Sequence, residues 1–327
     1  MNFDTLTTQE LTDRAEQLED AGKLDEALEF WRAAIRRETD PIVLSQFGSL
    51  ATKLQKWSDA ENALTLAIKL APELPYAYSL LGSLYFDQDK LEKAMQYFKK
   101  SLEIEKRAST LTQLGVVQLD LGLVDHGRAS LERAIELDPN YEEAYYNLGL
   151  IYREDESSRA VELFERAVEL DPEYAMAHRE LGWALSRLKD KDPEAEYHLR
   201  RAIELDDEDG WAHIYLGNIL WRRGDGDSAE KCFKRAVETW PEIATPYWCL
   251  ALFYEYENRP NDALKLYDQA LRIDPEDPVA NKTFGKYLLD TGQYEKARPY
   301  LRKALALNPG DRNTESALSQ LDGLEAK

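Results

Sequence analysis

The chain has 327 residues, and its 62 acidic and 41 basic side chains give a formal net charge of −21 at pH 7. This charge repels phosphate backbones and anionic membrane surfaces, so it argues against nucleic acid and membranes as partners. Apolar residues make up 43% of the chain and aromatic residues 10%, which suits a packed interior and excludes a disordered polymer.

Cysteine and histidine are too scarce for a disulfide framework or a zinc site, with two cysteines and four histidines and no paired motif. We therefore expect no metal, no cofactor and a reducing, cytoplasmic location. The sequence also lacks an export signal, and no stretch approaches eighteen uninterrupted apolar residues. Phosphate-binding loops, zinc-protease motifs and nucleophile elbows are missing, so we expect a protein that is not an enzyme.

The first predicted helix begins after Thr7. Thr7 and Glu10 form the Thr-x-x-Glu pattern of a capping box, and Leu11 follows as the first apolar residue of the helix. In a stacked array of repeats, a terminal repeat has one neighbour and must shield its open face. We expect this helix to open such an array.

A repeat of 33 to 35 residues runs through the rest of the chain. Three series of residues recur with this period and in one phase. The second series consists of Ala34 and its equivalents, and the third consists of prolines five residues after members of the second. The first series is a small residue that follows leucine or, at Gly48 and Gly285, phenylalanine: Gly48, Gly82, Gly115, Gly149, Gly182, Gly217, Ala251 and Gly285. The repeat predicts one elongated array rather than separate globular domains.

Each repeat has the pattern of two helices. In residues 142–174, apolar residues recur at three- and four-residue spacing on both sides of the polar stretch 153–158. Gly149 and Ala160 are small, and we expect them to let the two helix backbones approach closely. Pro172 disfavours a helical conformation in the preceding residue, so it ends the second helix.

These residues resemble the tetratricopeptide repeat. The family pattern is complete in one repeat as Leu148, Gly149, Tyr152, Ala160, Phe164, Ala167 and Pro172. The resemblance implies an all-α fold, a right-handed α-solenoid superhelix of about nine helix-turn-helix repeats. We expect a single array over residues 1–327, with repeats at 8–40, 41–74, 75–107, 108–141, 142–174, 175–209, 210–243, 244–277 and 278–311.

The carboxyl-terminal segment, residues 312–327, predicts one further helix. Ala317, Leu318, Leu321 and Leu324 recur at helical spacing on one side of this segment. We expect this helix to cap the ninth repeat, because the last repeat of an array has no neighbour on its outer side.

Each predicted first helix has a second stripe of residues that the packing motif does not use. In residues 210–222 this stripe consists of Trp211, Ile214, Asn218, Trp221 and Arg222. The resemblance implies that the corresponding side of each first helix lines the concave groove of the superhelix, where the family contacts partner peptides.

The character of these positions changes along the chain. In the first four repeats they are acidic, as at Asp87 and Asp120, whereas in repeats five to eight they are aromatic, apolar and cationic. Aromatic residues and arginine dominate the energetics of many interfaces. We expect partner binding by Tyr146, Leu150, Arg153, Arg179, Trp183, Arg187, Trp211, Ile214, Asn218, Trp221, Arg222, Trp248, Leu252 and Tyr256.

The sequence therefore predicts a non-enzymatic scaffold or adaptor that holds a protein partner in its groove. The partner would be a peptide or helix with apolar or aromatic anchors and acidic character. Two alternatives stay open: a regulatory or substrate-recruiting subunit of a separately encoded enzyme, and a self-assembling scaffold that forms a homo-oligomer. In a further alternative, the large side chains only fill the inner wall of a tight superhelix.

Overall fold

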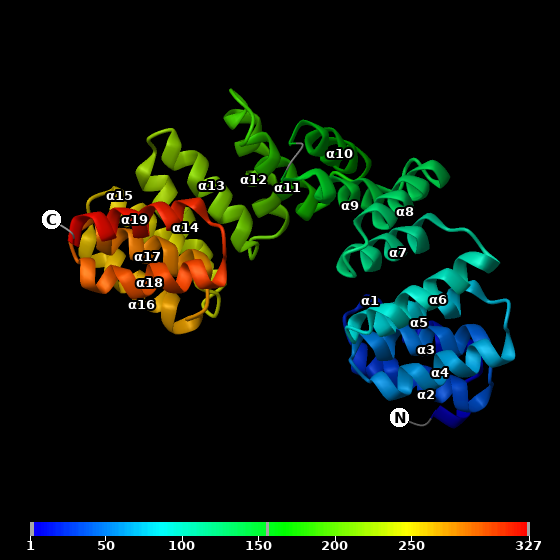
Figure 1. The fold of residues 1–327 in the computed structure, drawn as a ribbon. Helices are drawn as coiled ribbons and strands as arrows, with labels where there is room; N and C mark the ends of the chain where they lie inside the picture. The colour runs from blue at the N-terminus through cyan, green and yellow to red at the C-terminus, as the bar shows by residue number, and fades with distance from the viewer. Residues whose placement is uncertain (1–2, 155–156, 326–327) are drawn as a thin grey trace. The chain divides into compact units, whose positions relative to one another are not determined.

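The computed structural model describes residues 3–154 and 157–325. This part of the chain is built from α-helices, with a short 3-10 helix at Phe3–Thr5 and no β-strand, which confirms the all-α fold class (Figure 1). The helices are α1 Thr8–Asp20, α2 Leu24–Arg37, α3 Pro41–Lys53, α4 Trp57–Leu70, α5 Pro75–Asp87, α6 Leu91–Ile104, α7 Ala108–Asp120, α8 Val124–Leu137, α9 Glu142–Tyr152, α10 Ser157–Leu170, α11 Ala175–Leu185, α12 Asp192–Leu205, α13 Gly210–Arg222, α14 Gly226–Thr239, α15 Ala244–Tyr256, α16 Pro260–Ile273, α17 Pro278–Asp290, α18 Tyr294–Leu307 and α19 Arg312–Glu325.

Consecutive helices pack as pairs, from α1 with α2 to α17 with α18. Each pair falls within one of the intervals expected for the repeats, so every repeat has a first and a second helix. The contacts divide the chain into two compact units, unit 1 at Met1–Asp171 and unit 2 at Pro172–Lys327. Unit 1 holds the first five repeats and unit 2 the remaining four. A single array across both units stays a prediction.

Within each unit, the first helices form a continuous row. In unit 1, α3, α5, α7 and α9 contact one another in sequence, and in unit 2, α11, α13, α15 and α17 do the same. Inside a unit, each second helix contacts the first helix of the following repeat, as α12 contacts α13. The solvent-facing surface of the row of first helices in each unit is here called the first-helix face.

Close helix approach explains the small residues of the repeat. At Gly149 in α9, an added Cβ would come within 2.6 Å of the Phe164 ring in α10. At Gly82 in α5, the same substitution would meet the Phe98 ring in α6 at 2.6 Å. Ala160 and Ala167 of α10 are fully buried in the same interface. The expected role of the small residues is therefore confirmed.

The turns inside the repeats carry a feature that the three residue series do not include. One residue of the turn after α3, Gln55, has a left-handed conformation with φ of 56°, and Gly122 after α7 has φ of 73°. Around Gln55, its own N–H donates to the carbonyl of Thr52 and the N–H of Lys56 donates to Ala51, both at 2.8 Å. This pair of hydrogen bonds is the Schellman motif, which satisfies the last carbonyls of a helix.

Both ends of the described chain are capped. At α1, the Glu10 N–H donates to Thr7 Oγ1 at 3.2 Å and the Thr7 N–H donates to Glu10 Oε2 at 2.8 Å, so the predicted capping box forms. At the other end, α19 packs against α17 and α18 and buries Ala317 and Leu321, as expected for a capping helix. Leu324, which we expected to contribute to this cover, is exposed.

Candidate protein-binding surface

The predicted partner-binding residues of repeats six to eight lie on α11, α13 and α15 and in the turns directly after them. These helices form the first-helix face of unit 2. Two of the aromatic side chains are open to solvent, since Trp211 is 38% exposed and Tyr256 is 76% exposed. Trp183, Trp221 and Trp248 are partly buried. This face therefore combines accessible aromatic surface with aromatic side chains that are anchored in the protein.

One aromatic group joins α13 to α15. The Trp221 ring stands edge-on to Tyr256, with ring centroids 5.1 Å apart, and edge-on to Phe253, with centroids 5.7 Å apart. Phe253 is buried and also contacts Phe233 of α14. The buried rings fix the orientation of Trp221, and Trp221 in turn supports the exposed Tyr256. Such edge-to-face arrangements stabilise aromatic pairs.

A second aromatic group joins α11 to α13 through Tyr215, a residue that the sequence analysis did not include among the candidates. Trp211 stacks on Tyr215 with centroids 5.6 Å apart, and Trp183 lies 6.4 Å from the same ring. Trp211 also meets Trp240 edge-on at 6.0 Å. The signal in the sequence is the four-residue spacing between Trp211 and Tyr215, which places both side chains on the same side of a helix.

Two arginines border these aromatic groups. The Arg187 guanidinium lies 4.8 Å from the centroid of the Trp183 ring, in a cation–π contact. Arg222 donates to Asp192 Oδ1 at 2.7 Å and to the Ser186 carbonyl at 3.3 Å, and half of its side chain stays exposed. Both cations are therefore oriented by the protein and still accessible to a partner.

Arg179 has a structural role that the sequence did not predict. Its side chain is largely buried, with Nε 2.9 Å from Glu180 Oε1 and Nη1 2.9 Å from Asp209 Oδ2. Asp209 also accepts a hydrogen bond from the Ala212 N–H and so caps α13. The expected partner-binding cation is thus an ion pair that connects α11 to the start of α13.

Two other candidates for partner binding are buried, so their expected role is corrected. Ile214 is 2% exposed and Tyr146 is 8% exposed, so neither presents a surface to a partner. Both occupy the fifth position of a first helix, where the side chain turns into the protein. Tyr146 lies in unit 1 and packs against Phe164 of the same repeat, at 6.0 Å between ring centroids.

The remaining candidates differ in accessibility. Asn218 is exposed on α13, and Leu252 on α15 is partly buried. Leu150 and Arg153 belong to unit 1, where both are partly buried. The indole N–H of Trp248 is buried and has no hydrogen-bond partner among the described residues. The accessible part of the candidate set in unit 2 is therefore centred on Trp211, Trp221, Arg222 and Tyr256.

The histidines of unit 2 serve the interior. His178 Nδ1 lies 2.9 Å from His198 Nδ1, and His178 Nε2 lies 3.2 Å from the Pro172 carbonyl. His213 Nε2 lies 3.1 Å from the Asp207 carbonyl in the equivalent place of the next repeat. In the part of the chain that the structure describes, no three His, Cys, Asp or Glu side chains are arranged to hold a metal ion.

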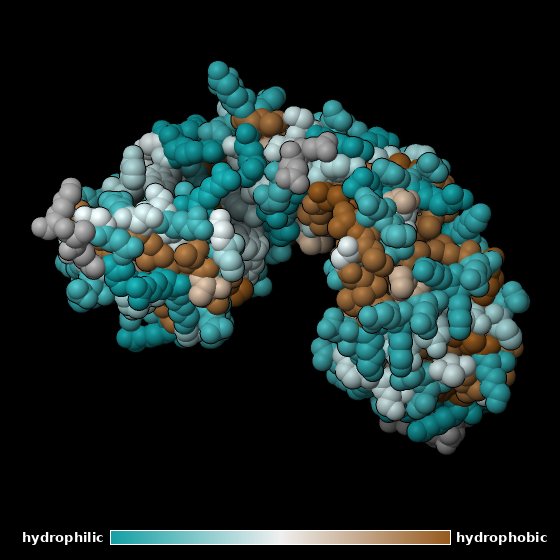
Figure 2. All heavy atoms as spheres, in the orientation of Figure 1, coloured by the Kyte–Doolittle hydropathy of each residue, from teal (hydrophilic) through white to brown (hydrophobic). Residues whose placement is uncertain are grey.

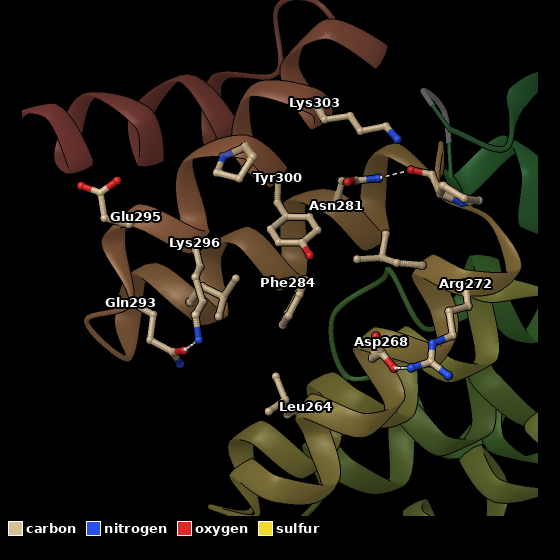
Figure 3. A pocket seen from close by; sticks show the side chains of 14 residues that line it. Leu264, Asp268, Arg272, Asn281, Phe284, Gln293, Glu295, Lys296, Tyr300 and Lys303 are labelled. Carbon is tan, nitrogen blue, oxygen red and sulfur yellow. Dashed lines mark hydrogen bonds and ion pairs between the residues drawn. The ribbon is translucent and has the colours of Figure 1, made fainter.

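A cavity of about 780 Å³ lies among α16, α17 and α18 (Figure 3). Leu264, Phe284 and Tyr300 contribute apolar side chains to it. Two pairs of polar side chains in its lining interact, since Arg272 pairs with Asp268 at 2.6 Å and Lys296 Nζ donates to Gln293 Oε1 at 3.1 Å.

Comparison with models of protein families shows which family the chain belongs to. Models described as tetratricopeptide repeats match residues 75–107, 108–141, 153–210, 216–278 and 256–321, and a model described as a TPR repeat matches residues 128–155. The chain belongs to the tetratricopeptide repeat family. This result agrees with the resemblance carried by the Leu-Gly, Ala and Pro series, and the tetratricopeptide repeat is a fold of protein-interaction modules.

Two individual proteins are similar to smaller parts of the chain. Protein NPGR2 of Arabidopsis thaliana is 32% identical over 119 residues, which are 34% of this chain and 16% of NPGR2. The barley (Hordeum vulgare) protein named probable UDP-N-acetylglucosamine–peptide N-acetylglucosaminyltransferase SPINDLY is 32% identical over 103 residues, 29% of this chain and 11% of SPINDLY. The chain thus spans less than two thirds of the length of either relative.

A crystal structure of a tetratricopeptide repeat protein from Parabacteroides merdae has the same fold. It is 19% identical, covers 75% of this chain and 98% of its own, and superimposes with a TM-score of 0.62. Within the described residues, no helix of this chain is both long and apolar enough to cross a membrane.

Proposed function

We propose that the chain is a non-catalytic adaptor whose first-helix face in unit 2 binds a protein partner. The observation that carries the proposal is the exposure of Trp211 and Tyr256 beside anchored aromatic rings and oriented arginines. Large rings held in place lose little conformational entropy on binding, and arginine provides a planar set of donors. Soluble proteins seldom leave such side chains clustered on a surface without an interaction to make.

The chemistry of the face defines the partner. Trp211, Trp221 and Tyr256 suit an apolar or aromatic anchor, and Arg187 and Arg222 suit carboxylates next to it. The partner we propose is therefore a peptide or helix that presents aromatic or aliphatic side chains flanked by acidic residues. In a protein of net charge −21, the arginines provide the local attraction that lets such an acidic segment approach.

The test begins with affinity capture of proteins by the intact chain and by the double variant Trp211→Ala, Arg222→Glu. Proteins that depend on both residues are identified, and their acidic-aromatic segments are made as peptides. We expect Tyr256→Ala, at a position 76% exposed, to weaken peptide binding by about tenfold or more without changing helical content.

Tyr197→Ala is the matched control, because Tyr197 is an equally accessible aromatic residue, 64% exposed, on the second helix α12. This variant should bind as the unmodified chain does. Unchanged peptide binding in both the Tyr256→Ala variant and the double variant would refute the proposed surface. An equal loss of binding in the Tyr197→Ala control would refute it as well.

A substrate-recruiting subunit of a separate enzyme is a second candidate. The similarity to SPINDLY, a protein named as a probable transferase, favours this candidate over self-assembly. Co-purification of the chain with a separately encoded catalytic chain, lost in the double variant, supports this candidate. Capture of non-enzymatic partners alone counts against it.

A further inference from the structure

Unit 1 contains a cavity of about 240 Å³ among the first helices α5, α7 and α9, with Phe98 of the second helix α6 also in its lining. Phe86, Phe98 and Val116 give it an apolar wall. Figure 2 shows hydrophobic side chains gathered on the part of unit 1 where α7 and α9 lie. The cavity lies wholly within unit 1 and is formed by other repeats than the surface proposed above, so the two can be tested separately.

Two carboxylates line this cavity, those of Asp87 at the end of α5 and Glu143 at the start of α9. Among the described residues, no cation or hydrogen-bond donor partners the Asp87 side chain. Partial burial raises the pKa of the Asp87 carboxyl, and both Asp87 and Glu143 are still exposed and open to a ligand. Glu143 accepts one hydrogen bond, from the Tyr141 hydroxyl at 2.6 Å, and carries a second carboxylate oxygen.

Each of the two amides in the lining uses one of its two N–H donors on the protein. Gln113 Nε2 donates to Ser83 Oγ at 3.1 Å, and Asn147 Nδ2 donates to the Glu143 carbonyl at 2.7 Å. The Ser83 hydroxyl itself donates to the Ser79 carbonyl. Each amide therefore keeps one N–H and its oxygen atom. The charged acceptors of the lining are the two carboxylates, and the amide oxygens add to them.

A buried hydroxyl gives an independent indication that this cavity is a ligand-binding site. Thr112 lines the cavity and is 2% exposed, yet its hydroxyl has no hydrogen-bond partner among the described residues. Buried polar groups are almost always hydrogen-bonded, so an unpaired one beside a cavity marks a place for a polar group from outside.

We propose that this cavity binds the arginine side chain of a partner peptide. The aliphatic stem of the arginine would contact Phe86 and Val116, and its guanidinium would lie against Asp87 and Glu143. A guanidinium carries five N–H donors and no acceptor, which complements a lining that offers acceptors. An anionic or phosphorylated ligand would meet two uncompensated carboxylates. Unit 1 would thus recognise a basic side chain, whereas the unit 2 surface recognises an acidic segment.

The probe is the capped tripeptide Gly-Arg-Gly, compared with the same peptide carrying citrulline, a neutral side chain of nearly the same shape. Binding to the full chain is followed by the NMR signals of the Val116 and Thr112 methyl groups, which line the cavity. We expect saturable shifts with the arginine peptide and none with the citrulline peptide. Asp87→Asn should weaken binding about tenfold, since charge-assisted hydrogen bonds contribute about 1.5–3 kcal/mol.

Asp120→Asn is the matched control, because Asp120 occupies the same position in the following repeat and does not line the cavity. Binding that this variant leaves unchanged supports the assignment to Asp87. Equal binding of the citrulline peptide, no response to either peptide, or equal weakening by both substitutions would overturn it. The tripeptide does not probe the aromatic surface of unit 2, so either proposal can fail alone.

Discussion

At the residue scale, the histidine pair of unit 2 shows how a buried contact depends on protonation. His178 Nδ1 and His198 Nδ1 are 2.9 Å apart, so one nitrogen must donate and the other accept. At least one ring must therefore be neutral. Burial, together with the charge of His178, lowers the pKa of His198 from 6.5 to about 4. The folded protein thus disfavours the protonated form of His198.

This shift predicts a dependence of stability on pH. The unfolded chain binds a proton at His198 near pH 6.5, whereas the folded chain does so only near pH 4. The contribution of His198 is therefore complete above pH 6.5 and is lost as the pH falls toward 4. We expect His198→Gln to lose less thermal stability between these pH values than the unmodified chain. The control His126→Gln changes an exposed histidine, and a similar effect there would contradict the assignment.

Individual residues also show which properties could not be predicted from the sequence. Among the residues that the sequence pattern placed on the second stripe of the first helices, Trp211 and Tyr256 are exposed. The sequence could not separate them from Ile214, because burial at that position depends on how the neighbouring helices pack. The role of Arg179 likewise depends on Asp209, which is 30 residues away and reaches it only after the repeats stack.

At the element scale, contact between the paired helices controls the geometry of each repeat. The leucine-glycine series made the helix pairs predictable, because only a residue without a side chain fits where α9 crosses α10 at Gly149. The turns were less predictable. Their left-handed residue is Gly122 in one repeat but Gln55 in another, so the backbone conformation is shared while the residue type is not.

Gly149→Ala should destabilise the protein. The added methyl would lie 2.6 Å from the Phe164 ring, and overpacking of this kind costs about 1–3 kcal/mol. The control is Gly323→Ala in α19, where a Cβ meets nothing within 4 Å and should stabilise the helix by about 0.5–1 kcal/mol. Urea unfolding measures both. A Gly149→Ala protein as stable as the parent would show that the helices can separate freely.

Gln55→Gly should stabilise the protein by about 0.5–1 kcal/mol, because glycine adopts the left-handed conformation without the steric cost that glutamine bears. Gly122→Ala provides the converse at the equivalent turn and should destabilise it by about 1 kcal/mol. Thermal unfolding of the two variants tests whether the conserved feature of the turn is its conformation. Shifts of the same sign in both variants would argue that it is not.

At the scale of the whole molecule, the two units present different chemistry on their first-helix faces. Unit 1 places carboxylates such as Asp87 beside a cavity, and unit 2 places tryptophans and arginines on its surface. The sequence predicted a change from acidic to aromatic positions after the fourth repeat, whereas the boundary between the units follows the fifth repeat. The sequence could not predict the cavity in unit 1, since the cavity depends on the spacing between α5, α7 and α9.

The central claim is that the first-helix face of unit 2 contacts the partner, and site-specific photo-crosslinking tests it most directly. A photoreactive phenylalanine analogue is placed at Trp211, at Tyr256, or at Leu264 on the second helix α16, where the native leucine is 41% exposed. We predict that the partner cross-links from positions 211 and 256 and not from position 264. Cross-linking from position 264 alone, or equally from all three, would contradict the account.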